Sequence, residues 1–537
     1  MIFPKNSQGE KRREKISKFT AGRHSICKPA DRMQQRCCMR SASAGSNTAA
    51  DARTADAADN ASISIGVKAD LTSLDPHKHN DIASAYATRH IYSNLVKLNE
   101  KTSEFEGCLA ESWEFKDDVT VEFTLKDDVK FHNGETLTAE DVKFSLDRQK
   151  SSAKVGHLVS MIDSVEVTDD THFIIHMNMP SNALISSLNH SESAILCKSY
   201  VEGLEATGRS LESAPMGCGP YKFDSWTPGA SFSLVKFDEY FDSEKAARNN
   251  RLVFKVIPDE TTRTAALENI QLDLLLHVNT TDAEQIRDSQ ALALDEYPTT
   301  EIEYLAMNTT RPPFDNKLVR QAFNYAINKN NIVIAAISGE GKPFDGYIGP
   351  SAIGYYDTAV NYEYNPEKAK LLLTEAGYAD GFSFSCCLSG DTRAKSAAVI
   401  QASLAQLGIT MNIEQVETSV FYEKTGSGEH DACLSGWAAN AEPDNTFRPL
   451  FTSEKVDKGG NYSFYMNPVV DALVDDAAVN RDAAVVKKDY ASIQKLVSED
   501  AIWVPLYTKK GLAARNANLQ GFIPSSIMTH DFTGLHY

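Results

Sequence analysis

The sequence holds fragments of catalytic and phosphate-binding motifs, and each fragment lacks an essential residue. A nucleophile elbow reads G-x-S-x-G, whereas residues 229–233 read GASFS and have no closing glycine. A phosphate-binding loop needs a first glycine and a hydroxyl residue after its lysine, but Ala336 and Pro343 occupy those positions. Neither HExxH nor GxGxxG occurs. These gaps favour a binding protein over an enzyme.

Two histidines, His77 and His79 in the segment DPHKH, have the best spacing for a shared metal ion. Alternate residues of a strand point to the same face, so both rings could reach one ion. Pro76 precedes them, however, and the sequence favours an exposed loop. No other His or Cys spacing completes a zinc site. We therefore predict that the protein needs no metal or other cofactor.

Length and charge narrow the class of protein further. The chain has 537 residues, and one hydrophobic core rarely serves more than about 250–300, so two or more lobes are expected. Residues 1–60 carry a net charge of +6, while the whole chain carries −19. An acidic body argues against a nucleic-acid partner, because binding phosphates requires a basic face. No segment approaches the roughly 20 apolar residues of a membrane-spanning helix.

The cysteines are isolated or adjacent, and none forms a CxxC pair. We interpret the cysteines of the folded body as small buried hydrophobic residues, although the sequence leaves disulfides open. The nine cysteines are Cys27, Cys37, Cys38, Cys108, Cys197, Cys218, Cys386, Cys387 and Cys433.

Residues 1–61 are expected to be an atypical leader and a disordered linker. A basic cluster at 11–18 begins like an export signal, but the segment after it is polar where about 7–15 apolar residues are needed. Residues 41–60 are rich in Ala, Ser and Asp, like the tether that follows the lipidated cysteine of a bacterial lipoprotein. Cys37 or Cys38 stands where that cysteine would lie. We interpret the leader as corrupted; the alternative is a cytoplasmic protein with a disordered head.

Hydrophobic periodicity predicts strands first and alternating helices and strands later. The folded body begins with a strand at Ile63, and apolar residues alternate along 121–131 and 172–179, as in antiparallel strands with one wet face. In the second half, helix–strand alternation predicts α/β structure with mainly parallel sheets. The predicted helices are 318–337 with Asp315 as cap, a helix begun by Asn365 and Pro366 and stopped by Gly377, Ala394–Leu407, and Asp482–Glu499.

Five segments, in order, resemble the large solute-binding proteins that serve oligopeptide, dipeptide, glutathione and nickel ABC importers. They occur in order within a resemblance that extends over about residues 62–537, and together they are far more specific than any one alone. The segments are SLDPHKHND (73–81), GCLAESWEF (107–115), KDDVKFHNGETLTAEDVKFSLDR (126–148), GCGPYKFDSW (217–226) and MNTTRPPFDNKLVRQAFNYAIN (307–328). Most of these residues make turns and caps, as Gly134 and Thr138 are expected to do, and so mark the fold rather than a ligand site.

The resemblance implies a two-lobed α/β fold of the periplasmic-binding-protein type (class II, large peptide-binding type) with an inserted subdomain. The two lobes would close over a solute about hinge strands near residues 300 and 508. Lobe I would combine 62–95, 186–300 and 508–537, the inserted subdomain would span 96–185, and lobe II would span 301–507.

In peptide-binding members of this family, an acidic residue after a Gly-Trp pair binds the peptide's α-amino group. Gly436 and Trp437 match this pattern here, but Asn440 aligns with the acid and carries no charge. The resemblance therefore places Trp437 and Asn440 at the site. Either Glu442 or Asp444 replaces the acid, or the solute has no free amine there. Alternatively, Glu442 and Asp444 lie in a solvated loop or cap a helix, and Trp437 lies in the core.

A partner for the solute's carboxylate is also expected. Arg393, just before a predicted helix, is the candidate, because a guanidinium binds a carboxylate bidentately. Its alternative role is that of a surface arginine. Tyr422 is a further candidate for the lobe II wall, and His77 and Asn80 are candidates for the lobe I wall.

These features predict an extracytoplasmic protein that binds a peptide-like solute for import and does not transform it. We expect the protein to be a monomer that is tethered to the membrane through a lipidated cysteine. Its partners would be an ABC permease and ATPase. The alternatives are a nickel-chelate, other metal-chelate or haem-binding protein of the same fold, a secreted peptide hydrolase, and a peptide-binding chaperone or signalling receptor.

Overall fold

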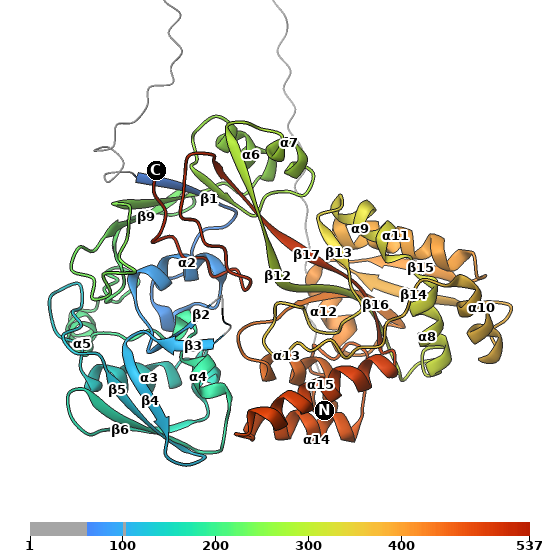
Figure 1. Cartoon of the computed structure of the whole chain (residues 1–537), viewed down its shortest axis with the longest axis horizontal. Helices are drawn as coiled ribbons and strands as arrows, with labels where there is room; N and C mark the ends of the chain where they lie inside the picture. Colours follow the sequence, from blue (N-terminus) through green and yellow to red (C-terminus); the bar gives the residue numbers. More distant parts are fainter. Residues whose placement is uncertain (1–61, 100–101, 103) are drawn as a thin grey trace, which may run out of the picture. The chain divides into compact units, whose positions relative to one another are not determined.

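The computed structural model of the protein describes residues 62–99, 102 and 104–537 (Figure 1). The predicted leader and linker, with Cys27, Cys37 and Cys38, lie outside the described residues. The six remaining cysteines are buried and free, which confirms their interpretation as small hydrophobic residues. In the described part of the chain, no helix combines the length and the apolar character that crossing a membrane requires.

One mixed sheet of 11 strands forms the framework of the described residues. Its order is β15-β14-β16-β12-β17-β11-β1-β10-β9-β8, with β13 paired to β17. These strands are β1 (Ser62–Val67), β8 (Tyr221–Thr227), β9 (Ser231–Lys236), β10 (Arg251–Val256), β11 (Leu274–Leu276), β12 (Leu292–Met307), β13 (Gly341–Pro343), β14 (Ser383–Leu388), β15 (Thr410–Gln415), β16 (Ala432–Ala438) and β17 (Trp503–Asn516). The prediction of mainly parallel sheets is wrong, because β12 and β17 run antiparallel to every strand that they pair with.

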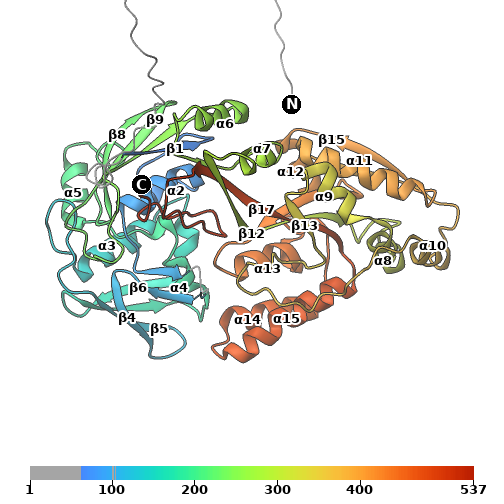
Figure 2. The same cartoon turned by 45° about the horizontal axis from the view of Figure 1, so that its top comes forward.

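Strands β12 and β17 connect the two lobes. They are 16 and 14 residues long, and they lie side by side in both views (Figures 1 and 2). Their pairing runs from Leu292 opposite Asn516 to Ala306 opposite Trp503, with an interruption between Pro298 and Ile302. The expected chain crossings near residues 300 and 508 fall inside these strands. The exact limits of the lobes stay a prediction.

A second sheet and a hairpin lie within the predicted inserted subdomain. The antiparallel order is β4-β5-β7-β6, beside the two-stranded β2-β3. The bounds are β2 (Val96–Asn99), β3 (Glu104–Gly107), β4 (Ala110–Phe115), β5 (Thr120–Leu125), β6 (Ile162–Val167) and β7 (His172–Met177). The predicted alternation is confirmed: Phe123 and Phe173 are fully buried and their rings stack 5.1 Å apart.

The helices cover both faces of this framework. In the first half they are α2 (Ile82–Ile91), α3 (Ala139–Lys150), α4 (Ala183–Ser187), α5 (Lys198–Ala206), α6 (Glu260–Glu268) and α7 (Ala283–Arg287). In the second half they are α8 (Lys317–Ala326), α9 (Lys329–Ile337), α10 (Pro366–Glu375), α11 (Asp391–Ala405), α12 (Thr418–Gly426), α13 (Asp444–Phe451), α14 (Pro468–Val479) and α15 (Ala483–Glu499).

Each lobe has its own hydrophobic core. In lobe I, Ile65 and Phe254 of the sheet pack with Phe532 from the C-terminal segment, which lies beside α2 (Figure 2). In lobe II, Tyr304 and Trp503 stack with their ring centroids 3.7 Å apart. Burying one large apolar side chain contributes about 1.5–3 kcal/mol, so each core contributes substantially to the stability of its lobe.

The predicted starts of three helices are confirmed. Thr138 and Asp141 form a capping box at α3, Asn365 caps α10, and Asp482 caps α15. The helix predicted over 318–337 is instead two helices, α8 and α9. Its cap is Asn316 rather than Asp315, and Asn328 starts the second helix after one extended residue.

The prediction of an exposed loop at DPHKH is wrong, since His77 and His79 are both buried. Asp75 accepts a hydrogen bond from the backbone N–H of His77 and so caps a short 3-10 helix (Pro76–Lys78). Arg148 of α3 then donates to Asp75 at 2.9 and 2.6 Å, which ties this segment to the inserted subdomain.

Gly219 offers a stringent test of the packing beside α2. A Cβ at this residue would lie 2.4 Å from the carbonyl oxygen of His90, which is backbone and cannot rotate away. We expect Gly219→Ala to destabilise the protein by about 1–3 kcal/mol, as overpacking does. Gly203 in α5 has open space around it, so Gly203→Ala should stabilise by roughly 0.5–1 kcal/mol. Thermal unfolding measures both; equal effects would contradict this packing.

Candidate functional site

A cavity of about 280 Å³ lies between the lobes. Lobe I contributes α2 with the turn before it, a loop near residue 190 and part of the C-terminal segment. Lobe II contributes the loop after β16, and β12 contributes two residues where it passes between the lobes. The lining residues are Asn80, Asp81, Ile82, Ala85, Arg89, Asn189, His190, Ser191, Glu192, Thr300, Glu301, Ala438, Ala439, Asn440, Ala441, Ser526, Ile527, Met528 and Thr529.

Helix α2 places two charged side chains on the lobe I wall. Asp81 is its N-cap and accepts hydrogen bonds from the backbone N–H and the hydroxyl of Ser84, both at 2.9 Å. Arg89 lies about two turns further along the helix and donates to the carbonyl oxygen of Asn189 at 3.3 Å. Among the described residues that line the cavity, Arg89 is the only lysine or arginine. It therefore supplies the permanent positive charge of the site.

Glu192 adds a buried negative charge to the same wall. Glu192 is 6 % exposed, and its carboxylate accepts a hydrogen bond from Ser191 Oγ at 3.0 Å. Nδ1 of His79 lies 3.6 Å from one carboxylate oxygen, and Nδ1 of His190 lies 3.7 Å from the other. Burial would raise the pKa of Glu192, but His190 and His79 lower it to about 2. Glu192 is therefore ionised near neutral pH.

The opposite wall depends on the interruption in the β12–β17 pairing. Thr300 lies in this interruption, and its hydroxyl donates to the carbonyl oxygen of Ala439 at 2.7 Å. Its backbone N–H donates to the carbonyl oxygen of Ser526 at 3.3 Å. Glu301 lies beside it and forms an ion pair with Lys509 at 3.4 Å. One break in a strand thus joins β12 to wall segments from both lobes.

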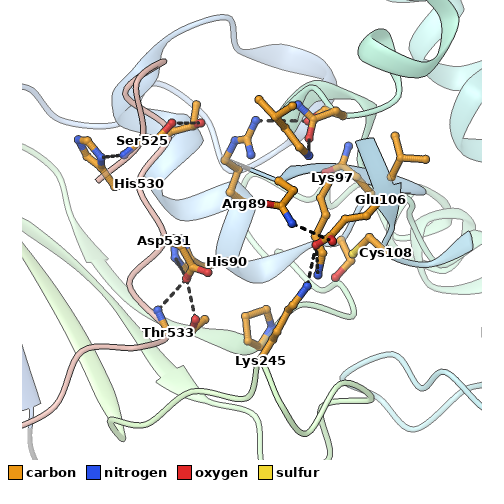
Figure 3. Close-up of a pocket in the computed structure, with 18 of the residues that line it drawn as sticks. Arg89, His90, Lys97, Glu106, Cys108, Lys245, Ser525, His530, Asp531 and Thr533 are labelled. Atoms are coloured by element: carbon orange, nitrogen blue, oxygen red, sulfur yellow. Dashed lines mark hydrogen bonds and ion pairs between the residues drawn. The ribbon is translucent and has the colours of Figure 1, made fainter. Parts of the chain in front are cut away.

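A second cavity of about 390 Å³ adjoins the first on the lobe I side (Figure 3). The two share Arg89, Asn189, Ile527 and Thr529 as lining residues. Figure 3 shows Lys97, Lys245 and Glu106 on one side of this second cavity. Lys245 and Glu106 form an ion pair at 2.8 Å, and Lys97 lies 3.7 Å from the same carboxylate. The second cavity therefore adds space for a solute next to Arg89.

Two of the residues proposed from the sequence, Asn80 and Asn440, line the cavity between the lobes. They lie on opposite lobes. Oδ1 of Asn440 accepts a hydrogen bond from the backbone N–H of Glu442 at 2.9 Å. Its amide nitrogen has no hydrogen-bond partner among the residues that the structure describes. Asn440 can therefore donate to a solute.

Trp437 at the end of β16, Glu442 in the loop after it and Asp444 at the start of α13 do not line the cavity. The indole N–H of Trp437 donates to Thr446 Oγ at 3.4 Å. Glu442 is buried, and its carboxylate accepts a hydrogen bond from the hydroxyl of Ser186 in α4. Asp444 begins α13 and pairs with Arg448 at 2.9 Å. Each of these side chains has a partner within the protein.

Arg393, Tyr422 and His77 also lie away from the cavity. Nε of Arg393 donates to Glu303 on β12 at 2.9 Å. Tyr422 is 58 % exposed on α12. Nδ1 of His77 lies 2.9 Å from the guanidinium of Arg148, and burial, with the Arg148 charge, lowers the pKa of His77 to about 3. His77 thus stays neutral within lobe I.

Sequence reasoning missed Arg89, Glu192 and Glu301. Arg89 and His90 stand in the last turn of α2, where basic residues commonly complement the helix dipole. Glu192 lies in the polar segment NHSES, which has the composition of a solvated loop. No local pattern distinguishes these residues from surface charges, since only the tertiary fold brings them to one cavity.

The two lobes also meet directly, away from the cavity. The backbone N–H of Asn182, in the predicted inserted subdomain, donates to the carbonyl oxygen of Ala478 at 2.8 Å, and its Nδ2 donates to the carbonyl oxygen of Asn480 at 2.7 Å. Arg481 donates back to Asn182 Oδ1 and to the Asp118 carbonyl oxygen, both at 3.0 Å. Together with the Ser186–Glu442 contact, these bonds hold the lobes in the arrangement that encloses the cavity.

This arrangement defines a class of protein. Two lobes with separate cores share a pair of long strands, and a polar, charged cavity lies where the lobes face one another. A solute that contacts both walls would favour the closed state through its differential contacts. The fold and the cavity are those of a solute-binding protein.

The chain belongs to the bacterial extracellular solute-binding proteins, family 5: the family model, described as "family 5 Middle", matches residues 104–458. Heme-binding protein A of Haemophilus influenzae is 30 % identical over 84 % of this chain and 87 % of that protein. Glutathione-binding protein GsiB of Shigella flexneri is 31 % identical over 86 % and 91 %. The motifs proposed from the sequence therefore identified the family correctly.

Solved structures agree with this assignment. HbpA2 from Haemophilus parasuis has a TM-score of 0.81 at 28 % identity, covering 88 % of this chain and 99 % of that chain. The binding protein DppA from Helicobacter pylori, in complex with the peptide STSA, has a TM-score of 0.72 at 29 % identity, with 89 % and 98 % covered. Members of this family are the solute-binding components of ABC importers and act with a permease and an ATPase.

Glu442 gives the contact between the lobes a predictable pH dependence. Burial raises the pKa of Glu442 above its usual 4.5. The folded protein then binds this proton more readily than the unfolded chain, so the contribution of Glu442 to stability falls as pH rises above about 4.5. We expect Glu442→Gln to raise the melting temperature at pH 7–8 and to leave it unchanged below pH 4.5.

A matched control for this variant is Glu375→Gln on the exposed side of α10, which should change nothing at either pH. In Glu442→Gln, the new glutamine can still accept a hydrogen bond from the backbone N–H of Asp444, and its amide can donate one to the hydroxyl of Ser186. A loss of stability at pH 7–8 would instead mean that these bonds require the charged carboxylate.

Proposed function

We propose that the protein captures a short peptide with free termini outside the cytoplasm and delivers it, unchanged, to an ABC importer. The observation that carries this proposal is the charge pattern of the cavity between the lobes. One guanidinium, Arg89, and the buried carboxylate Glu192 line the same small space. A zwitterionic solute complements that pattern, because each of its ends finds an opposite charge.

Arg89 binds the carboxylate of the solute. A guanidinium presents parallel N–H donors that match a carboxylate bidentately, and its charge strengthens those bonds in a partly desolvated site. Asn440 donates its amide N–H from lobe II, so the solute contacts both lobes and favours closure. The main cavity is near the lower end of the roughly 300–1,000 Å³ usual for small-ligand pockets, and the adjoining cavity adds length. This volume favours a dipeptide or tripeptide.

Relatives support the chemical class. GsiB, which is named for binding glutathione, is a tripeptide-binding relative at 31 % identity. The Helicobacter pylori relative holds the tetrapeptide STSA, and a dipeptide-binding protein from a Pseudoalteromonas strain holds Met-Leu at 25 % identity. The relative from Haemophilus influenzae is named for haem instead. Among the described residues, no cluster of three His, Cys, Asp or Glu side chains could hold a metal ion. Haem binding is kept as an outcome of the test.

The remaining parts of the proposal concern the protein's setting. It acts as a monomer at the outer face of the cytoplasmic membrane or in the periplasm, tethered through lipidated Cys37 or Cys38. Residues 62–95, 186–300 and 508–537 make up lobe I, residues 96–185 the inserted subdomain, and residues 301–507 lobe II. The solute leaves this protein chemically unchanged, because its role is to bind and close.

The direct experiment is native mass spectrometry of the gently purified full-length chain, followed by titration with glutathione, Met-Leu, Ser-Thr-Ser-Ala, haem and nickel–histidine. We expect a short peptide to co-purify or to bind, and to be recovered intact. Binding of haem or of the nickel chelate alone would contradict the peptide proposal. Cleavage of the peptide would contradict a binding role.

Substitution of Arg89 tests the carboxylate site. A hydrogen bond to a charged group contributes about 1.5–3 kcal/mol, so Arg89→Met should weaken peptide binding by roughly 10–100-fold in calorimetric titrations. Arg209→Met, at an exposed position after α5, is the matched control and should bind normally. The C-terminal amide of the same peptide should bind the unaltered protein as weakly as the free acid binds Arg89→Met. Full affinity for the amide would show that Arg89 does not bind this carboxylate.

A further inference from the structure

Three carboxylates line the cavity between the lobes, and two of them are already engaged by the protein. Asp81 accepts hydrogen bonds from Ser84 as the cap of α2 and a further one from the hydroxyl of Thr72. Glu301 forms an ion pair with Lys509 at 3.4 Å. Neither group is available to a solute without giving up a bond that supports the fold.

Glu192 is the third carboxylate and differs from the other two. Within the described residues, no lysine or arginine lies within ion-pair distance of it; its neighbours are the imidazoles of His79 and His190. Its carboxylate accepts hydrogen bonds from Ser191, His190 and its own backbone N–H, so every donor that contacts it is uncharged or a histidine. These contacts keep Glu192 ionised, and its carboxylate still lines the cavity without a lysine or arginine partner, which makes it a candidate for binding a cation.

His79 supplies an independent observation at the same place. Its side chain is fully buried, its Nε2 lies 3.2 Å from Thr88 Oγ, and its Nδ1 makes no hydrogen bond within the described part of the chain. That unpartnered nitrogen faces Glu192 at 3.6 Å. Burial lowers the pKa of His79, whose ring packs beside the Glu192 carboxylate.

We propose that Glu192 binds the ammonium group of the solute. This inference rests on the proposed function and names the group that replaces the acid missing at Asn440. It moves the recognition of the amine from lobe II, where an acid follows the Gly-Trp pair in peptide-binding relatives, to the lobe I wall. Arg89 lies on that wall too, so both charged ends of a short peptide are first held by lobe I.

This arrangement predicts a specificity. A peptide whose amine is blocked leaves Glu192 buried and unpaired, and this raises the free energy of the complex. The geometry therefore favours peptides with a free amine over N-acetylated peptides of the same sequence. It also favours short solutes, since the amine and the carboxylate must reach two residues that line one cavity of about 280 Å³.

The test combines a change in the solute with a change in the protein. Whichever of glutathione, Met-Leu or Ser-Thr-Ser-Ala binds is compared with its N-acetyl form by calorimetry. We expect acetylation to weaken binding to the unaltered protein by at least about 30-fold. With Glu192→Gln the free peptide should bind more weakly, and the ratio between the free and acetylated forms should fall to within about threefold of unity.

Glu301→Gln is the matched control, because it neutralises another carboxylate of the same cavity and should keep the full penalty for acetylation. Glu192→Asp keeps the charge and should keep most of the penalty, which supports the inference even if Glu192→Gln unfolds. A penalty that persists in Glu192→Gln, or one that disappears in Glu301→Gln, overturns the inference alone. Failure of the unaltered protein to bind any of the three peptides overturns the proposed function, and this inference with it.

Discussion

The pairing of β12 with β17 is the constraint on which the rest of the structure depends. These strands belong to the sheet of both lobes, so each lobe's core is built on one end of the same ladder. The ladder is interrupted between Pro298 and Ile302, and there Thr300 bonds to Ala439 on one side and to Ser526 on the other. The break thus lies where the ladder passes between the two cores, and its residues Thr300 and Glu301 line the cavity.

The charges around this crossing are arranged in two groups. Along the strands, Glu303 pairs with Arg393 and Lys509 at 2.9 and 2.8 Å, and Lys509 also reaches Glu301. These pairs are complete within the protein and stabilise the crossing. On the lobe I wall the carboxylate of Glu192 has only imidazole neighbours. The charged residues along the strands therefore stabilise the fold, whereas we propose that Glu192 binds the solute.

Much of the fold was predictable because it depends on local rules. Thr138 with Asp141, Asn365 with Pro366, and Asp482 mark helix starts through backbone bonds that neighbouring residues satisfy. The strand at Ile63 and the alternation around Phe123 follow from a period of two. The prediction that Asp315 caps α8 was wrong. Asn316, one residue later, is an equally good cap, and the sequence alone does not distinguish the two.

The site was predictable only where family motifs reach it. Asn440 follows the Gly-Trp pair and Asn80 lies in the segment SLDPHKHND, and both residues line the cavity. The other candidates have partners that sequence cannot reveal: Arg393 pairs with Glu303, which lies 90 residues away along the chain. Glu192 and His79 meet through a contact across 113 residues. Non-local contacts of this kind decide which charged residues serve the fold and which remain for a ligand.

The measurement that tests the central claim most directly is a crystal structure of the protein with its bound solute. The account predicts a short peptide in the cavity between the lobes, with its ammonium nitrogen within hydrogen-bond distance of the Glu192 carboxylate and its carboxylate at Arg89. A solute bound elsewhere, or an ammonium group held by Glu301 or Asp81 while Glu192 contacts only protein, would contradict it.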